Sequence, residues 1–127
     1  GSCQNRPLNT IVTDTGSLAS VVTNQISLPA GVYYTQFLGV GHQCDRMQGR
    51  IQNVTDATTL VLGMNIFSGV TGTQEVHAVG RGRFTLDGTK TLEFQQRCQT
   101  TRSTDGFGTP NNWGTEVYAT VEFWKLS

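Results

Sequence analysis

The sequence predicts an all-β fold, an antiparallel jelly-roll sandwich of about eight to ten strands. Nineteen threonines and twelve valines against five alanines favour pleated strands over helices. Fifteen glycines are scattered along the chain, and no window has the apolar spacing of an amphipathic helix. Short strand-like segments also recur at near-regular intervals between turn signals. Strands that follow one another without intervening helices indicate a sandwich or a jelly roll.

The strand-like segments lie at 7–14, 18–28 with a break near Asn24, 32–42, 47–55, 59–67, 73–86, 92–102 and 115–126. Turn residues separate them at 29–31, 56–58, 68–72 and 87–89, and a long loop at 103–114 precedes the last segment. Asp87-Gly88 predicts a β-hairpin, because this dipeptide suits the tight turn between paired strands.

Alternation assigns faces to the middle segments. Met47, Gly49 and Ile51 share the apolar side of one segment, and Leu92, Phe94 and Cys98 share that of another. Gln96 falls on this same apolar side, where an unpaired amide costs about 1 to 3 kcal/mol, so we expect it to have a hydrogen-bond partner. The glycines at 80 and 82 predict close approach of a neighbouring element to the 73–86 segment.

The last segment has two different faces. Val117, Ala119, Val121 and Phe123 form one face, and Glu116, Tyr118, Thr120, Glu122 and Trp124 form the other. The first face is suited to a core and the second to a partner.

Composition sets the domain count and disfavours several partners. Residues 1–2 have the character of an expression-tag scar, and we expect 3–127 to form one domain. Nine basic and nine acidic residues balance, so we expect no nucleic-acid partner. The longest apolar runs fall far short of the about 20 residues of a spanning helix, so we expect no membrane insertion.

The reactive side chains do not form a recognisable catalytic or metal motif. Cys3, Cys44 and Cys98 are too few for a disulfide scaffold or a zinc site, and we do not expect a Cys44–Cys98 bridge. His42, Cys44 and Asp45 are close in sequence but lack further ligands, and we expect a surface loop there. We therefore expect no enzyme activity, no metal and no cofactor. The sequon that begins at Asn53 is interpreted as a strand end before a turn.

The 103–114 loop contains the candidate ligand-binding residues. They are two aromatic and three short polar side chains: Asp105, Phe107, Asn111, Asn112 and Trp113. Aromatic rings offer apolar faces to sugars, and short amides and carboxylates satisfy hydroxyl groups with little loss of entropy. The alternative is that the two rings close the end of the sandwich while the polar residues cap turns.

From Asn24 onward the sequence resembles the carboxy-terminal domains at the tips of bacteriophage tail fibres. The matching segments are ISLPAGVY at 26–33, MQGRIQNVTD at 47–56, GRFTL at 82–86, EFQQRCQTT at 93–101, DGFG at 105–108, EVY at 116–118 and EFWK at 122–125. The LPAGVYY segment at 28–34 is also similar to the trimeric jelly rolls of the tumour necrosis factor and complement globular-head type. Similar fibre domains often have histidine where this chain has Met47 and Gln96, and the paired change fits neighbouring positions.

The resemblance implies a homotrimeric, non-enzymatic jelly roll in the virion, at the far end of a tail fibre. Its partners are then two identical subunits and a glycan or protein of the host bacterial surface. The trimer-interface candidates are the polar and aromatic residues expected on one sheet face: His77, Arg81, Arg83, Glu116, Tyr118, Glu122 and Trp124. Two alternatives stay open, a purely structural trimerisation head and an enzyme that degrades surface glycans.

Overall fold

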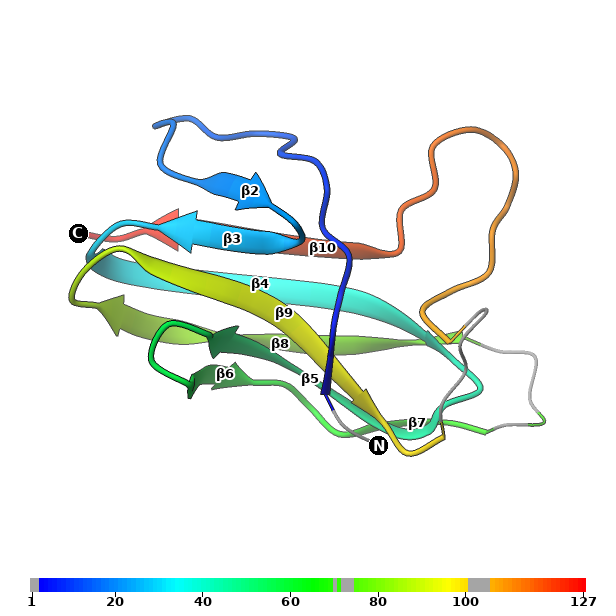
Figure 1. Ribbon diagram of the computed structural model, residues 1–127. Coiled ribbons are helices and arrows are strands. Elements are labelled where there is room, and N and C mark those ends of the chain that lie inside the picture. The colour runs from blue at the N-terminus through cyan, green and yellow to red at the C-terminus, as the bar shows by residue number, and fades with distance from the viewer. Residues whose placement is uncertain (1–2, 70, 72–74, 101–105) are drawn as a thin grey trace.

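Two antiparallel sheets face each other in the computed structural model (Figure 1). The structure describes residues 3–69, 71, 75–100 and 106–127, and every regular element among them is a β-strand. No helix in this part of the chain is long and apolar enough to cross a membrane. The all-β sandwich predicted from the sequence is therefore confirmed.

The larger sheet has seven strands. They are β1 (Cys3–Asn5), β2 (Ser20–Val22), β3 (Gln25–Leu28), β5 (Asp45–Asn53), β6 (Thr58–Leu62), β7 (Ile66–Ser68) and β9 (Lys90–Cys98). Their order is β2-β3-β9-β5-β6, with β1 paired to β9 and β7 paired to β5.

The smaller sheet has three strands, β4 (Gly31–His42), β8 (Glu75–Leu86) and β10 (Ala119–Lys125), in the order β10-β4-β8. The chain changes sheet at the connections β3–β4, β4–β5, β7–β8, β8–β9 and β9–β10. Repeated crossing between two antiparallel sheets is typical of a β-sandwich.

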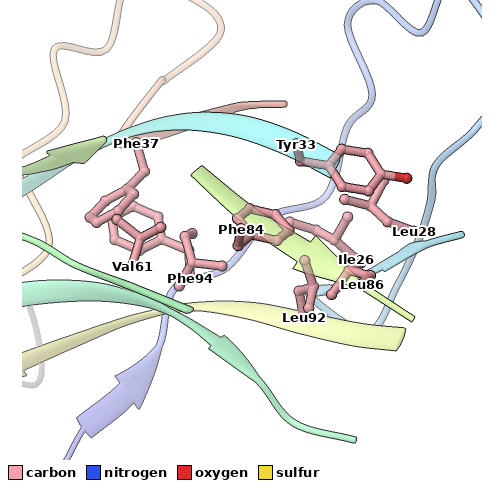
Figure 2. Close-up of a cluster of buried hydrophobic side chains, with 10 residues drawn as sticks. Ile26, Leu28, Tyr33, Phe37, Val61, Phe84, Leu86, Leu92 and Phe94 are labelled. Carbon is pink, nitrogen blue, oxygen red and sulfur yellow. The ribbon is translucent and has the colours of Figure 1, made fainter. Parts of the chain in front are cut away.

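Aromatic side chains from both sheets build one buried core (Figure 2). Phe37 of the smaller sheet packs against Phe94 of the larger one, with ring centroids 5.0 Å apart. Tyr33 stacks on Phe84 at 5.5 Å. A Cβ atom at Gly80 would lie 2.3 Å from the Phe37 ring, so this glycine permits the close packing predicted for its strand.

The predicted faces of β5 and β9 agree with the burial of their side chains. Met47, Ile51, Leu92 and Phe94 are all buried, and Gln96 is fully buried among them. The polar side chains between them face away from the core, where they are half-buried or exposed. The alternation of these two strands therefore predicted which side chains enter the core.

The predicted hairpin at Asp87-Gly88 is wrong. This turn joins β8 to β9, which belong to different sheets and do not pair. Tight hairpins lie instead between β2 and β3, where Thr23 and Asn24 have φ values of 52° and 64°, and between β5 and β6, where Ala57 has a φ of 56°. The Asn53 side chain caps this turn by accepting the Asp56 backbone N–H at 3.1 Å and donating to the Asp56 carboxylate at 3.0 Å.

Three predicted strand segments also differ from the structure. The 7–14 segment is not a strand, because Pro7 has no N–H to donate and Asp14 holds a turn by accepting the N–H groups of Leu18 and Ala19. The 59–67 segment is split at Gly63, whose N–H bonds Gly49 in the larger sheet, while the next residue bonds Val79 in the smaller one. The last strand begins at Ala119 and not at 115, because the preceding residues belong to a loop.

Candidate functional site

Residues 106–118 form a long loop at one end of the sandwich, drawn in orange in Figure 1, and are called the apical loop here. They include most of the residues predicted to bind a ligand. Asp105, the remaining one, lies outside the described residues. Charged side chains hold the base and the middle of the loop.

Arg6 holds the base of the apical loop. Its guanidinium donates to the backbone oxygens of Val40 at 3.0 Å, Phe107 at 3.3 Å and Tyr118 at 2.6 Å. The guanidinium carbon also lies 4.0 Å from the centre of the Phe107 ring, a cation–π contact. Because the Arg6 N–H bonds Phe94 in β9, this residue joins the larger sheet to the loop and to β4.

The Arg6 side chain is buried, with 1% of its surface exposed. Burial lowers its pKa from 12.5 to about 10, while the nearby thiols of Cys98 and Cys44 act in the opposite direction. Within the described chain it forms no ion pair, and its Nε atom is buried without a partner. Sequence reasoning missed this residue, because backbone carbonyls are its partners and leave no signal in the sequence.

Acidic side chains fix the middle of the apical loop. Glu116 accepts the backbone N–H of Asn111 at 3.0 Å and that of Asn112 at 2.7 Å. Glu75 of β8 accepts both the N–H and the hydroxyl of Thr109. Asn112 has a φ of 63°, a left-handed conformation that asparagine tolerates better than most residues. The loop is therefore braced from within and from the neighbouring sheet.

Trp113 lies in this braced loop with 90% of its surface exposed. The adjacent Asn111 and Asn112 are also exposed, and within the described chain their side-chain amides make no hydrogen bond. Phe107 is half-buried because its ring lies against Arg6. The structure thus brings two free amides beside one open aromatic ring, while Phe107 belongs to the base of the loop.

The trimer-interface candidates on the strands lie on one surface. The outer face, as it is called here, comprises the side chains of the smaller sheet that point away from the core: Tyr34, Gln36, Leu38, His77, Val79, Arg81, Arg83, Thr120, Glu122 and Trp124. The strand register places Trp124, Tyr34 and Arg83 in one row across the sheet, and Glu122, Gln36 and Arg81 in the next. The rings of Trp124 and Tyr34 lie 5.5 Å apart.

Of the remaining two interface candidates, Tyr118 and Glu116, only the first lies at the end of this face. Tyr118 lies beside β4 at the end of the outer face, because its backbone oxygen accepts the Val40 N–H at 2.9 Å. It borders a groove of about 120 Å³ together with His77 and Thr120. Burial raises the Tyr118 pKa, and the carboxylates of Glu116 and Glu75 raise it further. Glu116 does not join the face, because its carboxylate caps the apical loop.

The region around His42 and Cys44 was expected to be a surface loop, and that expectation is wrong. Cys44 is 1% exposed and His42 is 8% exposed. The Cys44 thiol donates to the backbone oxygens of His42 at 3.3 Å and Gly106 at 3.5 Å. Among the residues that the structure describes, no group of three or more His, Cys, Asp or Glu side chains is arranged to hold a metal ion.

Met47 and Gln96 are neighbours, as their paired departure from the fibre family suggested. The Gln96 amide nitrogen lies 2.8 Å from the Met47 sulfur and 3.4 Å from the backbone oxygen of Val40. The amide nitrogen therefore has the partners that its place on the apolar face required, while the amide oxygen is buried without a partner among the described residues.

Comparison of this chain with protein-family models, with curated proteins and with solved structures found no match.

Proposed function

We propose that this domain is the receptor-binding tip of a bacteriophage tail fibre, and that its apical loop binds a glycan or protein on the host bacterial surface. The observation that carries the proposal is Trp113, which is 90% exposed on a loop braced by hydrogen bonds. Tryptophan is enriched among residues that dominate binding energy, and a ligand that covers the exposed ring would remove its apolar surface from water. The sequence resemblance to fibre tips supports the same role.

The bracing of the loop favours binding. When the loop is already ordered, binding loses no further conformational entropy in ordering it. More of the free energy of the contacts therefore contributes to affinity. The exposed amides of Asn111 and Asn112 supply donors and acceptors beside the Trp113 ring. This combination of an apolar face with short polar groups fits a sugar ring.

A homotrimer is the assembly we propose, with the outer face covered by neighbouring subunits. Leu38 and Trp124 expose 39% and 45% of their surfaces there. Arg81, Arg83 and Glu122 make no ion pair or side-chain hydrogen bond within the described chain, so their charges are available to another copy. Exposed aromatic side chains with arginine are typical of protein interfaces.

A second exposed surface supports a ring-shaped assembly. The edge patch consists of Leu62, Met64 and Phe67, which lie in β6, β7 and their connection and are each more than 60% exposed. Two different apolar surfaces on one chain suit a head-to-tail contact, which closes into a ring when the rotation permits. Three linked apical loops would then raise the avidity of a weak site by about a hundredfold or more.

The test is an adsorption-blocking assay with the isolated domain on host cells. We expect Trp113→Ala to weaken blocking by about thirtyfold, the effect of losing a binding hot spot. The melting temperature and solution mass should stay unchanged, because the ring is exposed. Val12→Ala is the control, since Val12 is 92% exposed outside the apical loop. Equal blocking by Trp113→Ala and the native domain would place the receptor site elsewhere.

A structural trimerisation head is the second candidate, and the unpaired outer face is the observation that favours it. Such a head forms the trimer but binds no host surface. A trimeric domain that fails to block adsorption at any concentration would support this candidate. Release of reducing sugar ends from host polysaccharide would instead indicate a glycan-degrading enzyme.

A further inference from the structure

Two thiols lie in contact beneath the apical loop. Cys44 lies in the turn between β4 and β5, and its buried thiol donates to the backbone oxygen of Gly106 at the start of the loop. Cys98 is the last residue of β9 and is half-buried, and its thiol hydrogen-bonds to Cys44. Both cysteines are reduced in this structure.

The backbone holds these sulfur atoms near one another. Cys98 pairs with Met47 in the ladder between β5 and β9. Two further bonds continue the contact past the strand end, from Gln99 N–H to Arg46 oxygen at 2.8 Å and from Thr100 N–H to Cys44 oxygen at 3.1 Å. The backbone of the larger sheet therefore keeps Cys44 beside Thr100, two residues after Cys98.

We propose that Cys44 and Cys98 form a dithiol that closes to an intramolecular disulfide on reaction with a low-molecular-weight disulfide such as oxidised glutathione. Cys98, the more exposed thiol, loses its proton and attacks one sulfur of the oxidant. The S–S bond of the oxidant breaks, and one glutathione leaves with a proton. Cys44 then attacks the Cys98 sulfur, and the second glutathione leaves with the second proton. The two cysteines are oxidised and the small disulfide is reduced.

The disulfide would fasten the turn between β4 and β5 to the end of β9. A covalent link between residues so far apart in sequence restricts the unfolded chain and stabilises the fold. Cys44 would lose the hydrogen that it donates to Gly106, but the His42 N–H still bonds that oxygen at 2.9 Å. The start of the apical loop would therefore stay attached.

The rate of closure should rise with pH. Burial and the hydrogen bond to Cys44 raise the pKa of Cys98 from 9.0 to about 12. Only the thiolate attacks a disulfide, so the reaction should be slow at neutral pH and accelerate as the pH approaches that value. One consequence rests on the proposed function: a fibre made in the reducing host cytoplasm would gain the cross-link after release.

The test is oxidation of the folded protein followed by mass spectrometry of the intact chain without reductant. Cys3→Ser removes the third thiol and serves as the background. We expect this protein to lose two hydrogen atoms with no added glutathione, to melt on the order of 10 °C higher, and to revert with dithiothreitol. The melting shift is measured against the same protein kept reduced.

Single-thiol variants in the same background identify the steps. The Cys44→Ser protein should form a mixed disulfide between Cys98 and one glutathione and react no further. The Cys98→Ser protein should stay unmodified while folded, because Cys44 is buried. A Cys3→Ser protein that keeps two free thiols, or that carries glutathione without closing, would overturn the proposal. The mass of that protein alone decides the matter, so poor folding of Cys44→Ser does not affect the result. Receptor binding is not measured, so the outcome is independent of the proposed function.

Discussion

Arg6 connects the amino-terminal segment to the two sheets and to the apical loop. Its three acceptors are backbone oxygens, and its ring partner is Phe107. A buried charge without a carboxylate is costly, and the lowered pKa of Arg6 expresses that cost. The guanidinium is nevertheless suited to this position, because its fixed fork of donors reaches several carbonyls at once.

Replacement of Arg6 by methionine should therefore destabilise the domain. Methionine fills a similar volume but leaves the oxygens of Val40, Phe107 and Tyr118 without this donor, so we expect a loss of about 2 to 4 kcal/mol. Urea denaturation measures the change. Arg97→Met is the matched control, because Arg97 is exposed and should tolerate the change within about 0.5 kcal/mol. An Arg6→Met protein as stable as the native one would show that the contacts of Arg6 do not stabilise the fold.

Glu116 should order the middle of the apical loop. Glutamine at this position keeps one side-chain oxygen but loses the charge that strengthens bonds from the Asn111 and Asn112 N–H groups. We expect Glu116→Gln to speed hydrogen exchange of these two amides by about tenfold or more, with little change in the core amides. Unchanged exchange at both amides would mean that the loop is held by other contacts.

Sequence reasoning succeeded at residues whose environment follows from alternation and failed where backbone groups decide. Alternation placed Gln96 on an apolar face and predicted that its amide has a hydrogen-bond partner. In the structure the amide nitrogen lies against the Met47 sulfur. Arg6 and Glu75 received no role, because a carbonyl or an N–H of a distant loop leaves no trace in side-chain patterns. The bonds of Glu116 within the loop were not foreseen either, since the predicted strand extended backward to residue 115.

Strand interiors were predictable and strand connections were not. The interiors of β4, β5 and β9 follow their alternation, but Asp87-Gly88 joins two sheets where a hairpin was expected. A turn dipeptide fixes the local backbone, and core packing decides whether the strands on either side pair. The β5–β6 hairpin was less evident, because Ala57 occupies its left-handed position in place of glycine.

An ion pair at the β5–β6 hairpin should make the free energy of unfolding depend on pH in the acidic range. Asp56 lies 2.9 Å from Lys90, and hydrogen bonds from Lys90 and from Asn53 lower its pKa below 3.8. The unfolded chain therefore takes up a proton at a higher pH than the folded one does. The contribution of Asp56 is present above pH 3.8 and is lost as the pH falls through the lowered pKa.

Asp56→Asn should remove this part of the acid dependence. We expect its urea midpoint to be lower than that of the native protein at neutral pH and to fall less between about pH 5 and pH 2. Asp87→Asn is the control, because it removes the other carboxylate beside Lys90, at 3.3 Å, and leaves the pair between Asp56 and Lys90 intact. Parallel acid profiles for Asp56→Asn and the native protein would refute the assignment.

At the scale of the whole molecule, the outer face and the edge patch are the surfaces that the proposed trimer would cover. A charge placed in the middle of the outer face should prevent association, since a buried unpaired carboxylate costs several kcal/mol. We expect Leu38→Glu to yield monomer while Val12→Glu, far from this face in sequence and 92% exposed, stays trimeric. Analytical ultracentrifugation distinguishes the two states, and a trimeric Leu38→Glu protein would exclude this face.

Solution mass by multi-angle light scattering on the intact native chain tests the proposed assembly most directly. We expect a single species of three times 13.8 kDa that persists on dilution to micromolar concentration. A species of 13.8 kDa over the whole concentration range would contradict both the covered outer face and the avidity of three linked apical loops.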